Sequence, residues 1–300
     1  MRILIAGSSG LIGSELRRQL EADGHDVVRL VRHERRASDE VRWFPTARVV
    51  DPGVIATADA VVNFSGASTG RLPWTPGYKR EILRSRIDAT QTLADAIAVS
   101  LTPPATFLSA SAVGYYGDRP GESLPDDATK GEGFLSDVVD AWEQASRLAA
   151  HSTRVVNFRT GLVVGEGGAF TPLGLLTKLG LGATIGTGAQ FWPWISLHDE
   201  AAAIRHLLTS SLSGAVNLAG PTPASARQVT TTLAEAMHRW HPWRIPEPVV
   251  QAALREPGRE LLLPSQKVVP QRLLDDGFVF EHTTVDAAIN AVWPSRPATA

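Results

Sequence analysis

Cysteine is absent from the 300 residues of this chain, which excludes disulfides, thiolate nucleophiles and cysteine-ligated zinc. Charge of one sign is not in excess: 29 basic residues face 31 acidic ones, a formal net charge of -2. Such a balance lacks the electrostatic footprint of nucleic-acid binding, so we expect no nucleic-acid partner. Long apolar runs are missing too. In the first residues, "MRILIAGSSGLIG", the apolar run before the glycines is too short for a signal peptide or a membrane-spanning helix. We therefore expect a cytoplasmic protein with no membrane partner.

Lysine and tyrosine are scarce, with four and three copies, whereas hydrophobic residues make up 43% of the chain, as in ordinary globular proteins. In the first half, short apolar runs alternate with helical periodicity, which predicts parallel strands joined by helical crossovers. We expect an α/β fold, a Rossmann-type doubly wound parallel sheet with a small C-terminal substrate lobe. The expected strands cover 2–7, 25–32, 59–66, 105–112 and 153–165, and the expected helices cover 14–24, 81–100 and 133–150.

The pattern loosens after about residue 165, where glycine-rich and proline-rich stretches begin. We expect residues 1–165 to form the first domain, which contains the parallel sheet, and 166–300 mainly the C-terminal lobe, with 190–220 returning to the first domain. The end "SRPATA", residues 295–300, is expected to fray.

The first strand runs into "GSSGLIG", which places Gly7, Gly10 and Gly13 between a strand and a helix. One glycine allows the tight turn, one lets backbone approach a pyrophosphate, and one lets the helix pack closely. The free N–H groups of the helix then face the phosphates. A plain glycine-rich turn is the alternative, but the strand–loop–helix context favours a dinucleotide. The residues expected to bind it here are Gly7, Ser9, Gly10, Leu11, Ile12 and Gly13.

The second strand ends in Arg32, where NAD-binding proteins carry a carboxylate for the ribose 2′-hydroxyl. Guanidinium pairs with a 2′-phosphate, which a carboxylate would repel. His33, Glu34, Arg35 and Arg36 follow, and a solvated basic turn is the alternative. The position of Arg32 predicts NADP(H) as cofactor.

Several long motifs in order resemble the extended and atypical branch of the short-chain dehydrogenase/reductase superfamily. Within it the chain is most similar to the "epimerase family protein" group, whose members are described as nucleoside-diphosphate-sugar epimerases or as SulA-like. The resemblance covers almost the whole chain. The motifs are "GSSGLIG", "VVNFSGAS", "YKREILRSRI", "SASAVGYYG", "GFLSDVVDAWE", "FRTGLVVGEGGAF", "GTGAQFWPWISLHDEA", "AVNLAGP" and "LLLPSQKVVPQRLLDDGF".

The resemblance implies further cofactor contacts. Phe64, Ser65 and Gly66 would line the ribose and adenine side, and Arg86 would take a phosphate oxygen. Glu81 would accept from a ribose or the adenine amine, although Glu81 and Arg86 would also suit a solvent-facing helix. The remaining implied cofactor residues are Ser109, Arg159, Gly161 and Val163.

The superfamily's catalytic Tyr-x-x-x-Lys pair is absent. Ile82, Arg119 and Pro120 lie four residues after Tyr78, Tyr115 and Tyr116. In "GEGFLSDVVDAWEQ", Phe134 and Val138 stand where the pair is expected, one helical turn apart.

A serine of the catalytic set remains, since Ser111 best matches it. Tyr115 or Tyr116 follows closely, as a proton donor or as a wall of the pocket. We interpret Ser111, Tyr115 and Tyr116 as the catalytic candidates.

Three later features leave alternatives open. Trp192 and Trp194 suit hydrophobic walls or a stacking surface. His198 and Asp199 are expected to anchor a helix start rather than hold a metal, because no third ligand is present, so we expect no metal site. The cations of "PSQKVVPQR" suit a diphosphate or a plain surface turn.

The resemblance implies an NADP-dependent oxidoreductase or epimerase acting on a small molecule, such as a nucleotide sugar. The missing pair favours an alternative, an NADPH-binding sensor or scaffold protein with little turnover. The sequence does not indicate whether the protein is a monomer or an oligomer.

Overall fold

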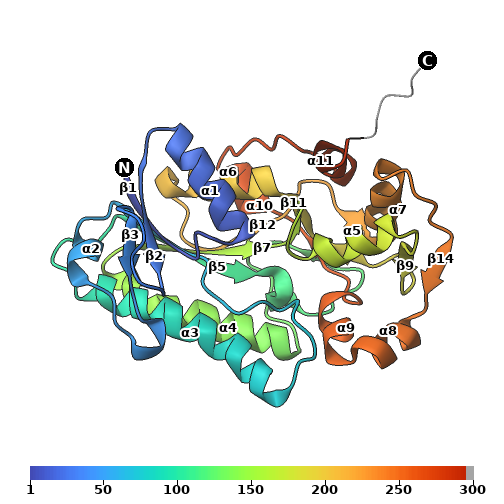
Figure 1. The fold of residues 1–300 in the computed structure, drawn as a ribbon, viewed down its shortest axis with the longest axis horizontal. Helices are drawn as coiled ribbons and strands as arrows, with labels where there is room; N and C mark the ends of the chain where they lie inside the picture. The colour runs from blue at the N-terminus through green and yellow to red at the C-terminus, as the bar shows by residue number, and fades with distance from the viewer. Residues whose placement is uncertain (295–300) are drawn as a thin grey trace. The chain divides into compact units, whose positions relative to one another are not determined.

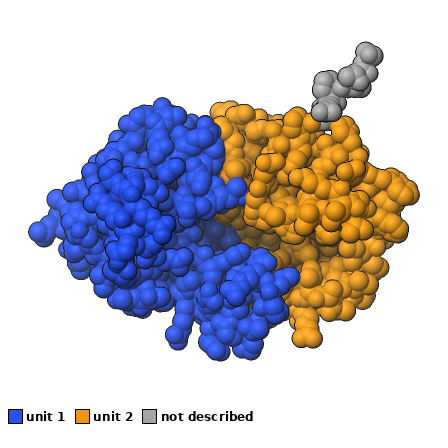
Figure 2. Space-filling model, viewed as in Figure 1, with its two compact units in different colours: residues 1–112, 137–159, 201–216 blue, residues 113–136, 160–200, 217–300 orange. Residues whose placement is uncertain are grey.

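The computed structural model describes residues 1–294, so the predicted frayed end at 295–300 lies outside the described residues. The chain divides into two units, which Figure 2 colours separately. Unit 1 comprises residues 1–112, 137–159 and 201–216, and unit 2 comprises 113–136, 160–200 and 217–300. This division differs from the predicted boundary at 165, because residues 113–136 belong to unit 2. The segment that returns to unit 1, 201–216, lies inside the predicted 190–220.

A seven-stranded sheet forms the centre of unit 1, in the order β12-β7-β5-β4-β1-β2-β3. The pairs of β1 with β2 and β4, of β2 with β3 and of β4 with β5 are parallel. Its strands are β1 (Arg2–Ala6), β2 (Asp26–Val31), β3 (Glu40–Arg42), β4 (Ala60–Asn63), β5 (Thr106–Ala112), β7 (Arg154–Thr160) and β12 (Gly214–Leu218).

Helices cover both faces of this sheet, with α1 and α6 on one side and α3 and α4 on the other (Figure 1). The helices are α1 (Leu11–Ala22), α2 (Pro52–Ala56), α3 (Pro76–Ala98), α4 (Phe134–Ser146) and α6 (Leu197–Thr209). Short 3₁₀ turns span Pro45–Ala47 and Arg147–His151. The expected α/β doubly wound architecture is confirmed.

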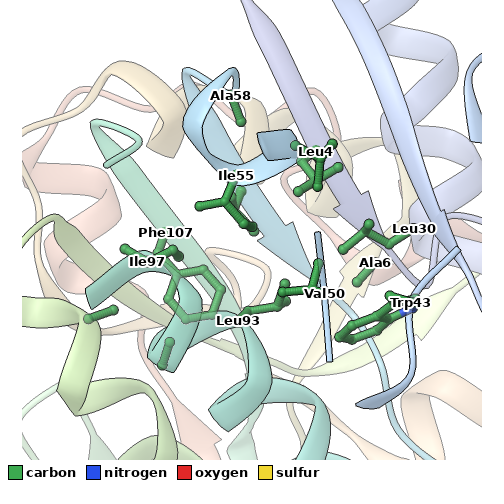
Figure 3. Close-up of a cluster of buried hydrophobic side chains, with 14 of the residues drawn as sticks. Leu4, Ala6, Leu30, Trp43, Val50, Ile55, Ala58, Leu93, Ile97 and Phe107 are labelled. Atoms are coloured by element: carbon green, nitrogen blue, oxygen red, sulfur yellow. The ribbon is translucent and has the colours of Figure 1, made fainter. Parts of the chain in front are cut away.

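One apolar core lies between the sheet and α3. Leu4, Leu30 and Phe107 from the strands meet Leu93 and Ile97 of α3 (Figure 3). All five side chains are at most 3% exposed. The central strands are buried on both faces, which is why they read as continuous apolar runs in the sequence.

Two predicted boundaries were wrong for local reasons. Helix α3 begins at Pro76 rather than 81, because Thr75 accepts a hydrogen bond from the Tyr78 N–H and proline suits the first helical position. The predicted strand 153–165 is two strands, because the chain changes partner at Gly161. The Gly161 N–H still donates to Leu218 O of β12, whereas the Leu162 N–H donates to Pro193 O. The chain then continues as β8 (Leu162–Val164), which pairs with β11 (Trp194–Ser196).

Unit 2 is built from short elements around a second core. Its strands are β6 (Ser123–Leu124), β8, β9 (Ala183–Ile185), β10 (Phe191–Trp192), β11, β13 (Ala224–Ser225), β14 (Trp243–Ile245) and β15 (Lys267–Val268). Its helices are α5 (Phe170–Lys178), α7 (Ala226–Ala236), α8 (Glu247–Leu254), α9 (Glu256–Leu261), α10 (Gln271–Asp275) and α11 (Val285–Val292), with a 3₁₀ turn at Val113–Tyr116. None of the helices in the described part of the chain is long and apolar enough to cross a membrane.

Candidate functional site

The centre of the unit 1 sheet has a topological switch point between β1 and β4. The chain leaves β1 towards β2 on one side, and leaves β4 towards β5 on the other. Gly7 follows β1 and Phe64 follows β4, and the Phe64 N–H donates to Ala6 O at 2.8 Å. Ligands of open α/β sheets bind outside the carboxyl ends of the strands at such a point.

The glycine loop is shaped by two of its glycines and left open at the third. Gly7 has a φ of 81°, and a Cβ there would come within 3.0 Å of Phe64 Cβ. A Cβ on Gly13 would lie 2.5 Å from Gly7 O, so Gly13 lets helix α1 pack against the loop itself. Gly10 is exposed, and a Cβ there would meet only Gly7 O, at 3.4 Å. The surface beside Gly10 is therefore accessible to a ligand.

Helix α1 begins at Leu11, three residues earlier than predicted, so Leu11 and Ile12 lie in its first turn. The N-cap is Gly10, and no side chain caps it. The amides of a first helical turn have no partner within the helix. Together with the exposed Ser9, they form the part of the loop that suits an anion.

The arginines in and after β2 are of two kinds, those that bond to other residues of the chain and those that do not. Arg29 pairs with Asp39 at 2.5 Å, Arg35 donates to Ala37 O and Ser38 O, and Arg42 pairs with Glu34. Arg32 and Arg36 are exposed, and neither guanidinium makes a hydrogen bond or ion pair with the described residues.

Arg86 lies against the loop that follows β4. Its Nη1 donates to Ala67 O and Ile82 O, each at 3.0 Å, and its guanidinium stacks over Trp142. Burial lowers the pKa of Arg86 to about 10, so the side chain remains a cation at neutral pH. No carboxylate in residues 1–294 pairs with it.

Gly66 makes room for this arginine, because a Cβ there would lie 3.1 Å from Arg86 Cγ. Sequence reasoning missed the buried network that holds this loop. Asn63 Oδ1 accepts from the Ser65 N–H at 3.0 Å, and Asn63 Nδ2 donates to Thr90 Oγ1 at 2.9 Å. Trp142 Nε1 donates to the same Thr90 oxygen at 2.8 Å. The polar Asn63 at the end of an apolar strand is the signal that could have found it.

Glu81 and Ser109 take no part in the contacts around Arg86 and Asn63. Glu81 is exposed on α3, and its carboxylate has no partner in the described part of the chain. Ser109 is fully buried, and its hydroxyl reaches only Ala110 O, at 3.5 Å.

Ser111 belongs to a buried network that the sequence did not suggest. Its hydroxyl donates to Glu143 Oε1 at 2.6 Å, and Arg159 grips both oxygens of that carboxylate, at 2.8 and 2.9 Å. Ser111 and Arg159 are 3% and 4% exposed. The Ser111 proton is therefore committed to Glu143, and the Arg159 guanidinium lies in the interior of unit 1.

The two candidate tyrosines of unit 2 have different environments. Tyr116 is fully buried, and its hydroxyl donates to Asn217 Oδ1 at 2.7 Å. Tyr115 is half-buried, with its ring edge-on to Tyr116. The Asn217 N–H in turn donates to Asp126 Oδ1, so Tyr116 is part of the packing of unit 2.

Gly161 and Val163 also have partners within unit 2. A Cβ on Gly161 would lie 2.2 Å from Pro193 O, so the glycine serves close backbone packing. Val163 is 9% exposed and pairs with Ile195 between β8 and β11.

Phe134 and Val138 take up the first turns of α4, as expected. The amides of Phe134 and Leu135 donate to the two oxygens of Glu260, at 3.2 and 3.1 Å. A carboxylate from the C-terminal segment therefore caps this helix. Val138 is 2% exposed, so a lysine introduced there would lie in the interior.

The other features that the sequence singled out are structural in this fold. Trp192 and Trp194 are 5% and 1% exposed and donate their Nε1 hydrogens to Leu262 O and Thr222 O, which favours the wall interpretation over a stacking surface. Asp199 lies in the first turn of α6, as expected, and accepts from Ser196 and from the His282 N–H. Among residues 1–294, no group of three His, Asp or Glu side chains is arranged to hold a metal ion.

The segment 265–272 is tied to the turn that carries the tyrosines. Gln266 donates to Val113 O and Gly117 O, and Ser265 N–H donates to Asp118. Lys267 is exposed beside Phe191. The surface-turn interpretation therefore accounts for most of this segment.

Comparisons with known proteins agree with this architecture. A sequence model described as the NAD dependent epimerase/dehydratase family matches residues 3–220, and one described as a domain of unknown function, DUF1731, matches 245–292. Epimerase family protein Mb2239 of Mycobacterium bovis is 39% identical over 290 residues, which is 96% of each chain. Human epimerase family protein SDR39U1 is 34% identical over 297 residues, which is 97% of this chain and 99% of the human one.

Solved structures give the same result. The crystal structure of human epimerase family protein SDR39U1 (isoform 2) with NADPH has a TM-score of 0.88 at 32% identity and covers 97% of this chain and 99% of its own. A nucleoside-diphosphate sugar epimerase from Corynebacterium glutamicum has a TM-score of 0.79 at 29% identity over 98% of this chain, but only 58% of its own. The fold and site thus define a Rossmann-type protein of the short-chain dehydrogenase/reductase kind. The chain belongs to the NAD dependent epimerase/dehydratase family, and its relatives are the SDR39U1-like epimerase family proteins.

Proposed function

We propose that this protein binds NADP(H) at the switch point of unit 1 and transfers hydride to or from a hydroxyl-bearing small molecule, such as a nucleotide sugar. The open first turn of α1 beside Gly10 suits the pyrophosphate. The similar human SDR39U1 structure contains NADPH, which supports the same cofactor here. The nucleotide-sugar class is supported by the description of the Corynebacterium relative.

The observation that carries the cofactor proposal is the state of Arg86. Burial lowers its pKa, it remains a cation, and no carboxylate of the described residues neutralises it. A desolvated cation without an ionic partner is unfavourable unless an anion binds beside it. The missing side chain of Gly66 lets Arg86 lie against the loop after β4, and a phosphate oxygen of the dinucleotide beside this guanidinium would supply the missing charge.

Arg32 and Arg36 supply the specificity for a 2′-phosphate. Both are exposed and uncommitted among residues 1–294, whereas the neighbouring Arg29, Arg35 and Arg42 are paired within the chain. Arg32 directly follows β2, the position at which an NAD site would carry a carboxylate.

In the reaction, the bound cofactor supplies or accepts hydride, and the chain must handle a proton on the substrate oxygen. Tyr115 is the better placed of the two tyrosines for this role, because the hydroxyl of Tyr116 is buried on Asn217. Ser111 donates its proton to Glu143, so its free lone pairs would accept from a hydroxyl group.

We expect NADPH to bind more tightly than NADH, and Arg32→Ala to remove most of the difference. Losing a charge-assisted hydrogen bond costs about 1.5–3 kcal/mol, or roughly 10- to 150-fold in affinity. Calorimetric titration of both cofactors into both proteins measures this. Arg35→Ala is the matched control, because Arg35 is committed to Ala37 O and Ser38 O and should change the ratio little. Equal affinities for NADPH and NADH in the unaltered protein would contradict the assignment.

A second function, an NADPH sensor or scaffold with little turnover, is favoured by one specific observation. The chain lacks Tyr-x-x-x-Lys, and the hydroxyl protons of Ser111 and Tyr116 are donated to partners inside the protein. General acid–base catalysis is worth about 10²–10⁴-fold, so its loss leaves slow chemistry. Following the oxidation of bound NADPH with a panel of candidate carbonyls separates the two functions.

A further inference from the structure

Helix α5 exposes leucines to solvent. It buries Phe170, Gly174 and Thr177, whereas Leu175 and Leu176 are 57% and 43% exposed. Surface helices of globular proteins carry charged or polar residues on the outer face. The chain continues this apolar face beyond the helix, with Leu179 at 65% and Leu181 at 55% exposure.

Two exposed tryptophans lie on the segment that packs beside the chain after α5. Strand β14 pairs with β9 so that Trp243 lies opposite Ala183, and a Cβ on Gly182 would come within 3.5 Å of the His241 ring. Trp240 and Trp243 are 80% and 58% exposed. We call this the tryptophan–leucine surface; it comprises Leu175, Leu176, Leu179, Leu181, Trp240 and Trp243. An exposed apolar cluster of this kind marks an interaction site.

Exposed cations lie within this surface, and the exposed Glu235 and Glu247 flank it in the chain. The two segments that form it, 174–183 and 237–246, contain Lys178, Arg239 and Arg244 and no acidic residue, in a chain with 31 acidic residues. All three cations are exposed. The surface therefore combines tryptophan and leucine with positive charge, which is the composition of protein surfaces that lie in a membrane–water interface.

We propose that the tryptophan–leucine surface of unit 2 docks on an anionic lipid bilayer. A second copy of this chain fits less well, because a two-fold interface would place Lys178, Arg239 and Arg244 against the same cations of the partner. Anionic headgroups complement these charges instead, and the apolar side chains enter the boundary between headgroups and acyl chains. The prediction of no membrane partner rested on the missing span, which a surface lying on the bilayer does not need.

The test is co-sedimentation of the full chain with vesicles of phosphatidylcholine, with and without phosphatidylglycerol. Each basic residue near an anionic surface contributes roughly fivefold in affinity, so the three cations predict binding on the order of 100-fold tighter to the anionic vesicles. Added salt should weaken this binding. The double variant Trp240→Ser with Trp243→Ser should lose it at least tenfold, and Lys178→Glu with Arg239→Glu should abolish the preference for anionic lipid.

Leu101→Ser is the matched control, because Leu101 is fully exposed in unit 1 and lies outside the surface. It should sediment like the unaltered protein, and all variants should keep its NADPH affinity, which separates this test from that of the cofactor site. The proposal is overturned if the unaltered chain does not sediment with anionic vesicles, or if the tryptophan variant sediments equally well. It is also overturned if light scattering shows a dimer that the tryptophan variant converts to a monomer.

Discussion

Replacing Glu143 by alanine is expected to lower the free energy of unfolding by about 3–5 kcal/mol. Glu143 accepts two hydrogen bonds from Arg159 and one from Ser111, and the Arg159 side chain is 4% exposed. Without the carboxylate, the buried guanidinium loses two hydrogen bonds and the opposite charge of Glu143. The loss should appear as a large downward shift of the denaturant midpoint in equilibrium unfolding.

Glu122→Ala is the control for this measurement. Glu122 pairs with Arg119, but its side chain is 52% exposed, and exposed ion pairs contribute little to stability because solvent screens them. Glu143→Gln should fall between the two, because an amide oxygen still accepts from Ser111 or Arg159. If Glu143→Ala cost no more than Glu122→Ala, the buried network would not stabilise unit 1.

Glu200→Gln is expected to stabilise the protein at alkaline pH and to change little at pH 5. Glu200 is fully buried, and burial raises its pKa from 4.5 to about 8, although the hydrogen bond from Thr160 opposes the shift. The folded state therefore keeps this proton over a range in which the unfolded chain has lost it. Stability falls as pH rises from about 4.5 through about 8, by a total on the order of 5 kcal/mol.

The glutamine variant is neutral at every pH, so its stability lacks this slope. Unfolding free energies of both proteins at pH 5 and pH 9 measure the difference, and the gain at pH 9 is the expected result. The second oxygen of Glu200 has no hydrogen-bond partner in the described part of the chain, so the amide replaces a group that is already unsatisfied. A gain of equal size at both pH values would mean that ionisation of Glu200 is not the cause.

The sequence predicted the elements whose signal is local. Strand β1, the glycine loop and helix α1 follow one another within 22 residues, and each has its own pattern of apolar or glycine positions. The prediction missed β3 because three residues carry no periodicity of their own. This strand forms through its parallel pairing with β2.

The site residues divide in the same way. The positions of Gly7 and Arg32 could be predicted because each directly follows a strand, and Gly10 directly precedes α1. Their contact with a cofactor stays a prediction. Glu143 could not, because its meaning depends on Ser111 and Arg159, which are 32 and 16 residues away in the chain. The sequence around Glu143 in α4 does not indicate that side chains from two separate strands donate hydrogen bonds to it.

The prediction of a catalytic role for Tyr116 shows what a sequence motif cannot give. The motif placed a tyrosine after β5, but a motif contains no information on burial. In the structure Tyr116 is fully buried against Asn217, 101 residues away. A catalytic role among the tyrosines therefore depends on which side chain is accessible, and Tyr115 is the more exposed of the two.

Calorimetric titration of NADPH into the Gly10→Val variant tests most directly whether the α1 loop holds the cofactor. A Cβ at Gly10 meets only Gly7 O, at 3.4 Å, so the fold tolerates a side chain, which would project into the surface open to the pyrophosphate. The account predicts that binding is lost while the melting temperature stays close to that of the unaltered protein. Arg18→Ala, on the exposed side of the same helix, should bind normally. Unchanged NADPH affinity in Gly10→Val would contradict the account, because the pyrophosphate would then lie elsewhere.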